Sequence, residues 1–391
     1  MRASTLLAIL PLACAAPSKR ASPAPVLVPR NAQVIEGKYI VKFKGDAKTD
    51  AVSAAVSSIT ADADYTYSHS FHGFAASLSK AEVEKLQNNP QVEFLEQDAV
   101  VTISATQENA DWGLARLSSQ KPGGTTYTYD DSAGEGTCAY IIDTGVDVEH
   151  PEFEGRAKFL ANYVDKDNTD GNGHGTHVSG TIGSKTYGVA KKTQIFGVKV
   201  LDANGSGQNS GVIAGMEFVA KDGPGQSCPK GVVVNMSLGG GKSDAVNAAA
   251  AKIVEAGLFL AVAAGNDGAD ASGYSPASEA SACTVGATAI DDSLATYSNF
   301  GSIVDVLAPG TDITSTWPGG KTNKISGTSM ASPHVAGIGA YFLGLGQKAS
   351  GLCEYIAQNA LKDTISGVPS DTKNLLINNA QGGNGTSFRR F

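Results

Sequence analysis

The feature of this sequence that most limits its fold is a series of short, wholly apolar runs that alternate with helical stretches. The runs cover residues 138–142, 195–200, 232–234, 258–263 and 283–287. The helical stretches cover residues 175–182, 210–220, 243–255 and 330–343. Apolar runs without polar alternation are typical of strands that are buried on both faces. The pattern therefore predicts an α/β fold, with a mostly parallel sheet covered by helices.

A separate α+β domain is predicted before Trp112. Residues 38–44, 71–78 and 92–97 have the pattern of strands, and residues 49–59 and 80–87 have the pattern of helices. This order suits a small independent domain over about residues 34–101, and that stretch contains no nucleophile with a base. We expect residues 102–110 to form an exposed linker to the α/β region.

The first residues have the pattern of a secretory signal. Arg2 precedes the apolar run Leu6–Leu12, which Ala13-Cys14-Ala15 follows as a cleavage site. No other apolar run is long enough to span a bilayer, so we expect a soluble, extracellular protein that does not enter a membrane. The formal net charge of −8 and the lack of a basic stretch argue against a nucleic-acid partner.

The cysteines fit this extracellular prediction. Cys14 leaves with the signal, and Cys138, Cys228, Cys283 and Cys353 remain. An even number of cysteines in an oxidising compartment predicts two disulfides. The sequence alone allows three connectivities.

Four polar residues lie where an α/β fold places its chemistry. Asp143 and Asn266 each end a buried apolar run, His174 lies in a glycine-rich loop before a helix, and Ser329 opens an apolar helix. Ligands bind beyond the carboxyl ends of parallel strands, and helix N-termini favour negative charge. The four residues are therefore candidates for a carboxylate, an oxyanion donor, a general base and a nucleophile.

Each candidate also has an alternative explanation. Taken singly, the serine is an ordinary cap, and the aspartate and asparagine are turn residues. His174 and His177 suggest a zinc pair, but their spacing is one residue short of the H-E-x-x-H motif and its glutamate is missing. An esterase of the G-x-S-x-G type is nearly matched by Gly327-Thr-Ser-Met-Ala331, but its triad runs in the order Ser, Asp, His. A non-enzymatic peptide-binding module is a further alternative. Loss of the candidate serine, histidine or aspartate would have indicated it, and all three are present.

Taken together, the motifs resemble those of the subtilisin-like serine proteases, the peptidase S8 family. The matching segments are Asp143-Thr-Gly-Val, His174-Gly-Thr-His-Val-Ser-Gly, Ala263-Ala-Gly-Asn and Ser326-Gly-Thr-Ser-Met-Ala-Ser-Pro-His, in the family's order. Trp112-Gly-Leu-Ala-Arg, Pro151-Glu-Phe-Glu-Gly-Arg, Tyr187-Gly-Val-Ala-Lys-Lys and Ser275-Pro-Ala-Ser look like the proteinase K branch of secreted fungal enzymes. Residues 34–101 resemble the inhibitor I9-type prodomain. The resemblance implies a sheet of the seven-stranded type with helices on both faces, after a ferredoxin-like prodomain.

The resemblance also implies roles for single residues. Ser329 would be the nucleophile, His174 the base and later the acid, and Asp143 the residue that holds the tautomer of His174. Asn266 and the backbone N–H of Ser329 would form the oxyanion hole. His177 would then be a packing residue.

The implied substrate cleft is formed by two segments that pair with an extended peptide. Its residues would be Gly205, Ser206 and Gly207 on one side, and Ser237, Leu238 and Gly239 on the other. Ala263 and Gly265 would complete the pocket for the residue before the scissile bond. Small pocket walls imply broad specificity with a preference for large apolar or aromatic residues.

The resemblance further implies a structural calcium ion and a disulfide pairing. Asp305 matches the strong calcium site, together with the backbone carbonyls of Ala280 and Ala282, and oxygen ligands suit Ca²⁺. At a second, weaker site, Gln120 and Thr364 stand where the usual ligands would be. No catalytic metal is implied. The implied disulfides are Cys138–Cys228 and Cys283–Cys353.

The sequence therefore predicts a secreted, monomeric serine endopeptidase that is made as a zymogen. Residues 1–15 would be the signal peptide, residues 16–105 the propeptide and residues 106–391 the peptidase domain. The partners would be protein and peptide substrates, and the propeptide itself as inhibitor and folding template.

Overall fold

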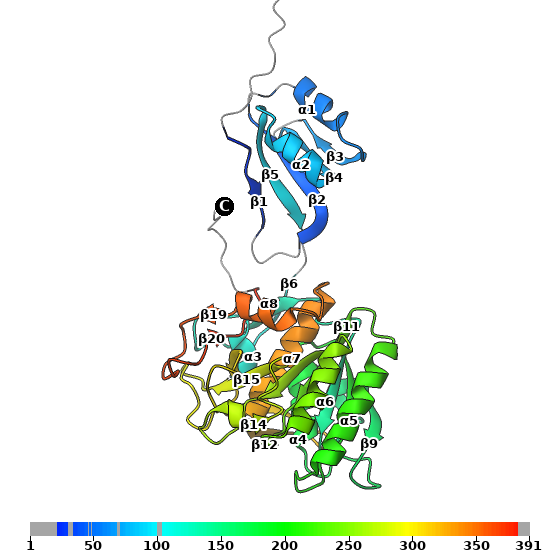
Figure 1. Cartoon of the computed structure of the whole chain (residues 1–391), viewed down its shortest axis with the longest axis vertical. Helices are drawn as coiled ribbons and strands as arrows, with labels where there is room; N and C mark the ends of the chain where they lie inside the picture. The colour runs from blue at the N-terminus through cyan, green and yellow to red at the C-terminus, as the bar shows by residue number, and fades with distance from the viewer. Residues whose placement is uncertain are drawn as a thin grey trace, which may run out of the picture. The chain divides into compact units, whose positions relative to one another are not determined.

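The computed structural model describes residues 22–29, 34–45, 47, 49–68, 71–99 and 104–381. These residues form two compact units, one up to residue 99 and one from residue 104, coloured blue to cyan and cyan to red in Figure 1. The predicted signal peptide lies outside the described residues. No helix within the described ranges combines the length and the apolar character needed to cross a membrane.

The first unit is a five-stranded sheet with two helices. Its elements are β1 (Val26–Leu27), β2 (Val34–Phe43), α1 (Thr49–Val56), β3 (Ala63–Tyr67), β4 (Gly73–Ser77), α2 (Lys80–Gln87) and β5 (Val92–Ala99). The strand order is β1-β5-β2-β4-β3, and β2 to β5 pair antiparallel around a β-α-β-β-α-β chain path, as the ferredoxin-like prediction requires. The core includes the fully buried rings of Phe43 and Phe74.

Several strands were not predicted, and β3 and β6 show why. Strand β3 is polar and mostly exposed, so it has no apolar run to mark it. Strand β6 (Ser104–Gln107) pairs antiparallel with β7 (Tyr127–Asp130), so the prediction of an exposed linker over residues 102–110 is wrong for Ser104–Gln107. Backbone hydrogen bonds to β7, rather than apolar side chains, give β6 its structure.

The second unit is built on the predicted parallel sheet. Seven of the nine strands of this sheet are consecutive neighbours in space: β8 (Thr137–Asp143), β9 (Ala157–Asn162), β10 (Gln194–Lys199), β11 (Gly231–Met236), β13 (Phe259–Ala263), β15 (Cys283–Thr288) and β16 (Val306–Pro309). Their order in space is β16-β15-β13-β11-β8-β10-β9, and every pair is parallel. At one edge β20 (Leu375–Leu376) pairs parallel with β16, and β19 (Leu361–Lys362) pairs antiparallel with β20.

Helices cover both faces of this sheet (Figure 1). They are α4 (His174–Gly183), α5 (Asn209–Asp222), α6 (Asp244–Glu255), α7 (Thr328–Gly344) and α8 (Leu352–Asn359). Side chains of β8 alternate between two cores: Ala139 and Ile141 pack with α4, α7 and α8, whereas Tyr140 and Ile142 pack with α5 and α6. The apolar runs are therefore buried on both sides, as the sequence predicted.

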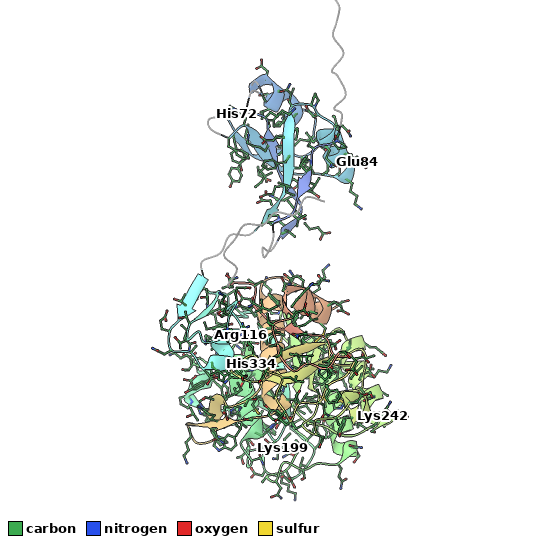
Figure 2. All side chains as sticks on the ribbon, turned by 90° about the vertical axis from the view of Figure 1, so that its left-hand side faces the viewer. His72, Glu84, Arg116, Lys199, Lys242 and His334 are labelled. Carbon is green, nitrogen blue, oxygen red and sulfur yellow. A yellow bond between two sulfur atoms is a disulfide. The ribbon has the colours of Figure 1, made fainter. Side chains whose placement is uncertain are left out.

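The second unit also contains several shorter elements. They are the helix α3 (Trp112–Arg116), the hairpin β17 (Ile313–Trp317) and β18 (Lys321–Ile325), the short pair β12 (Gly240–Gly241) and β14 (Tyr274–Ser275), and the 3₁₀ turns 151–153, 223–225 and 271–273. A buried ion pair joins Arg116 (Figure 2) to Asp292, with 2.9 Å between Nη2 and Oδ2.

The two implied disulfides, Cys138–Cys228 and Cys283–Cys353, are both present, so that prediction is confirmed.

Candidate active site

The four candidate residues lie at the starts of helices and the ends of parallel strands. Asp143 is the last residue of β8, and Asn266 follows β13 after a short turn. His174 opens α4, and Ser329 lies in the first turn of α7. The carboxyl ends of parallel strands all lie on the same side of the sheet, so the fold brings these four side chains to that side.

His174 and Asp143 form a hydrogen-bonded pair. His174 Nδ1 lies 2.8 Å from Asp143 Oδ1, the Asp143 side chain is fully buried, and that of His174 is 23% exposed. Burial lowers the pKa of His174, but the charge of Asp143 and its hydrogen bond outweigh burial and hold the pKa above the ordinary 6.5. A proton on Nδ1 satisfies the carboxylate and leaves Nε2 of the neutral ring free to accept a proton.

Thr144 and Asp170 hold this pair in place. The backbone N–H of Thr144 donates to Asp143 Oδ1 at 2.7 Å, and its hydroxyl donates to Asp170 Oδ1 at 2.8 Å. The buried Asp170 carboxylate also accepts from the backbone N–H groups of Gly173 and Thr176, both at 2.8 Å, so it caps the start of α4. Lys199 (Figure 2), buried at the end of β10, donates to the Thr144 carbonyl at 2.8 Å.

Ser329 is half-buried, and buried polar groups fix its backbone. Ser237 Oγ donates to the Ser329 carbonyl at 2.7 Å, and Asn235 Nδ2 donates to Ser237 Oγ at 2.9 Å. Ser332 Oγ completes the chain by donating to Asn235 Oδ1 at 2.8 Å. The hydroxyl of Ser329 itself donates to the carbonyl of Ser237 at 3.2 Å, and the described contacts include no bond from it to His174. The hydroxyl must therefore rotate to reach an acceptor on that ring.

Asn266 is oriented by its side-chain oxygen. Oδ1 accepts from the N–H of Thr328 at 2.8 Å and from its hydroxyl at 2.9 Å, which leaves the two N–H bonds of the exposed amide for another partner. The loop that carries Asn266 is held by the buried Asn299. Its Oδ1 accepts from the N–H groups of Asp267 and Ala269, both at 3.0 Å.

Most of the implied substrate residues line one cleft. Its cavity measures about 600 Å³, and the lining includes His174, Gly205, Ser206, Gly207, Ser237, Leu238 and Gly239. Ala263 and Gly265 do not line this cavity: Ala263 is buried, and Gly265 packs against Asn299. The lining also contains Asn172 and Leu201, which the sequence did not single out.

Some supporting residues were also missed by the sequence analysis. Asp170 stands in the glycine-rich loop just before His174, so its position close to His174 was a usable signal. Asn235 and Asn299 gave no comparable signal. Asn235 binds Ser332, which lies 97 residues away along the chain, and Asn299 binds Asp267 and Ala269, which lie 32 and 30 residues away.

The second histidine of the loop takes a different position from the first. His177 is fully buried in α4, and its Nε2 donates to the carbonyls of Ile313 (3.0 Å) and Asn323 (3.2 Å). A nitrogen that carries this proton cannot bind a metal ion. The other nitrogen, Nδ1, is buried without a hydrogen-bond partner among the described residues, and the ring packs against Trp317. The surroundings of His177 are those of a packing residue.

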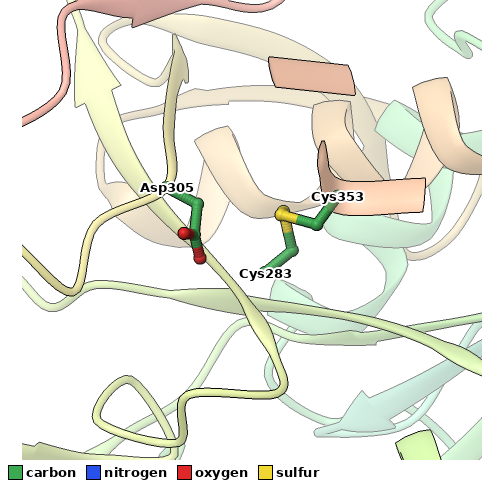
Figure 3. Close-up of side chains that lie close together, drawn as sticks. All are labelled: Cys283, Asp305 and Cys353. Carbon is green, nitrogen blue, oxygen red and sulfur yellow. A yellow bond between two sulfur atoms is a disulfide. The ribbon is translucent and has the colours of Figure 1, made fainter. Parts of the chain in front are cut away.

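The residues implied for calcium line a second cavity, of about 420 Å³, which includes Asp305, Ala280 and Ala282. The ammonium of Lys373 lies 2.8 Å from Asp305 Oδ1. The carboxylate lies beside the Cys283–Cys353 disulfide (Figure 3), whose bonded sulfurs offer no thiolate to a metal. A carboxylate together with backbone carbonyl oxygens, as implied for Ala280 and Ala282, would be a donor set of the kind that Ca²⁺ prefers.

Comparison with known families and structures gives consistent matches. Residues 134–391 match the subtilase family (peptidase S8), and residues 38–104 match the family of peptidase inhibitor I9. A solved structure described as a cold adapted subtilisin-like serine proteinase superposes with a TM-score of 0.65 at 43% identity. The match covers 70% of this chain and 99% of that one.

Two proteins with similar sequences are named fungal proteases. Proteinase T of Parengyodontium album is 74% identical over 291 residues, which are 74% of this chain and 99% of that protein. The cuticle-degrading protease of Metarhizium anisopliae is 54% identical over 386 residues, which are 97% of this chain and 100% of that protein.

Proposed function

This chain belongs to the subtilase family, in its proteinase K-like branch, and is a serine endopeptidase; we propose that it is secreted as a zymogen and cleaves extracellular proteins with broad specificity. The single observation that carries the proposed catalytic reaction is the hydrogen bond of 2.8 Å between His174 and the buried Asp143, next to the helix that presents Ser329. The preferred residue before the scissile bond would be large and apolar or aromatic.

In the proposed reaction, the Ser329 hydroxyl turns from Ser237 to His174 Nε2 and attacks the carbonyl carbon of the scissile peptide bond. His174 takes the hydroxyl proton as the new C–O bond forms, and Asp143 stabilises the resulting imidazolium. The proton then passes from His174 to the leaving amine as the C–N bond breaks. Water, activated by the same nitrogen, hydrolyses the acyl-enzyme and restores Ser329.

The proposed oxyanion hole consists of the Asn266 amide and the backbone N–H of Ser329. Support for Asn266 comes from its two bonds to Thr328, which hold the oxygen and leave the N–H groups available. Fixed donors stabilise the negative oxygen of the tetrahedral intermediate without reorganisation during the reaction.

The proposed peptide-binding segments are residues 205–207 and 237–239, which share the lining of the 600 Å³ cleft with His174. An extended peptide between them would pair through backbone groups, and such pairing demands little of the substrate sequence. Ala263 and Gly265 lie outside the lining of this cavity, so their place in the wall of a specificity pocket stays a prediction from the family resemblance.

The proposed maturation removes residues 1–15 as a signal and residues 16–105 as a propeptide, and leaves residues 106–391 as the enzyme. Ala105 belongs to β6 and is paired with Tyr129. A protease binds its substrate as an extended, unpaired segment, so β6 would have to separate from β7 before cleavage at this point.

We also propose a structural calcium ion at Asp305, Ala280 and Ala282. Support comes from the shared cavity and from the oxygen chemistry of its lining. When bound, the ion would tie the start of β16 to the loop before β15. It would take no part in the reaction.

The test of the function is hydrolysis of a blocked tetrapeptide anilide that ends in Phe. The secreted, processed protein should cleave it, and a serine-directed sulfonyl fluoride should abolish the cleavage. Ser329→Ala should be inactive and, expressed without other proteases, should accumulate as the full-length precursor. Processed protein that cleaves no peptide would overturn the proposal, and normal processing of Ser329→Ala would overturn self-maturation.

A further inference from the structure

We propose that Lys373 is a built-in cation at the calcium site proposed above, so that calcium binds there only by displacing the lysine ammonium. Both oxygens of Asp305 already have a donor. Oδ1 accepts from Lys373 Nζ at 2.8 Å, and Oδ2 accepts from the backbone N–H of Thr284 at 3.1 Å. This proposal rests on the calcium site proposed above, and in it the Lys373 ammonium competes with calcium for the Asp305 carboxylate.

The position of Lys373 follows from the pairing of strands. Strands β16 and β20 are parallel with Leu307 opposite Leu376, and the N–H of Ile377 donates to the Leu307 carbonyl at 3.0 Å. Asp305 and Lys373 lie just before these paired residues on adjacent chain segments. The sheet therefore holds the backbone of Lys373 beside the carboxylate, whichever rotamer its side chain adopts.

The side chain of Lys373 is nevertheless able to leave. Its exposed fraction is 49%, against 25% for Asp305, and both residues line the 420 Å³ cavity. An ammonium with this much solvent access can move into water at little cost, and an exposed ion pair is weak. The site can thus exchange a tethered monovalent cation for a free divalent one.

Charge determines how strongly the two cations compete. The Asp305 carboxylate supplies one negative charge and Lys373 cancels it, whereas calcium affinity rises with the negative charge of the ligands. A displaced ammonium still tethered about 5 Å away also repels the ion, which weakens binding by about tenfold at the dielectric constant of water. Without calcium, Lys373 keeps the carboxylate paired.

The experiment uses processed enzyme inactivated with a serine-directed sulfonyl fluoride, with calcium chloride as the probe. Calcium affinity is measured by calorimetric titration, and the Tm is measured in excess calcium and in excess chelator. The variants are Lys373→Met, which removes the charge, and Lys373→Arg, which keeps it. Lys362→Met is the matched control, since Lys362 is an exposed lysine of neighbouring β19. Asp305→Asn assigns the titrated ion to this site.

We expect Lys373→Met to bind calcium about tenfold more tightly than the unchanged enzyme, by the charge argument above. Its Tm should fall in chelator and recover in calcium, whereas Lys373→Arg and Lys362→Met should behave like the unchanged enzyme. Equal calcium affinity in the unchanged enzyme and Lys373→Met, lost in Asp305→Asn, would overturn the role of Lys373 and leave the calcium site intact. No calcium binding that depends on Asp305 in any variant would overturn the calcium site, and the inference with it.

Discussion

At the scale of single residues, the proton on His174 controls the proposed reaction. Asp143 holds the pKa of His174 above 6.5 despite burial, so the neutral base becomes abundant only above that pH. We expect kcat/KM to rise with pH to a plateau, with a midpoint above 6.5, measured from pH 5 to 9. A flat profile would contradict the assignment.

Asp143→Asn tests the cause of this shift. The substitution removes the charge that raises the pKa of His174 and leaves the burial that lowers it, so the midpoint should move to lower pH. The rate should also fall, by about 10⁴ in kcat as for triads of this type, because the amide favours the wrong tautomer. A midpoint that moves to higher pH would show that Asp143 does not set the pKa.

Asn266 permits a second test at this scale. Asn266→Ala should lower kcat by about 10²–10³ and change KM little, the loss known for the equivalent donor in a member of the same family. The reason is that the amide stabilises charge that exists only in the transition state. The control is Asn359→Ala, which should keep full activity. Asn359 lies on α8, and its side-chain amide donates a hydrogen bond to the carbonyl of Tyr355. A loss confined to KM would mean that Asn266 binds substrate instead.

At the scale of elements, the packing of α4 decides whether His174 meets Asp143. A Cβ on Gly175 would lie 2.0 Å from the carbonyl oxygen of Gly145, in the backbone that follows Asp143. Backbone atoms cannot move aside as a flexible side chain can, so Gly175→Ala should push α4 away from β8. We expect kcat to fall at least tenfold and stability to fall by about 1–3 kcal/mol, the usual cost of overpacking.

The measurements for Gly175→Ala are kinetics with the anilide substrate and denaturant unfolding of the inhibited enzyme. Gly225→Ala is the control, because Gly225 is exposed and a Cβ there meets nothing within 4 Å. Wild-type kcat in Gly175→Ala would mean that α4 tolerates the shift and that the close approach has no catalytic role.

Elements also show what the sequence could predict. The helix predicted at residues 330–343 is α7, Thr328–Gly344, and that at 80–87 is α2, because both have strong apolar or capping signals. Strands β3 and β6 were missed because polar residues gain their order only from a neighbouring strand. The residues of the candidate site differ in the same way in how far the sequence could predict them. Asp143 and His174 carry local motifs, whereas Asn299 acts through contacts that only the folded chain creates.

At the scale of the whole molecule, burial perturbs two histidines of the second unit, His177 and His334. His177 in α4 and His334 in α7 bond only to backbone carbonyls, and burial lowers the pKa of each to about 4. In the unfolded chain each histidine has its ordinary pKa of 6.5. Between pH 6.5 and about 4, each ring therefore takes up a proton in the unfolded chain but not in the folded chain. Protons therefore favour unfolding in this range.

We expect the contribution of these two histidines to the stability of the processed, inhibited enzyme to be constant above about pH 6.5. It should fall as the pH drops towards 4, by about 3 kcal/mol for each histidine. His334→Gln removes one of these titrations, because glutamine is neutral at every pH. Its Tm should be lower than that of the unchanged enzyme at pH 7.5, since a buried contact is lost, but it should fall less steeply between pH 6.5 and 4.5. The measurement is the Tm at half-unit steps of pH. Parallel curves for the two proteins would show that His334 titrates alike in the folded and unfolded chains, and that its burial has no part in acid unfolding.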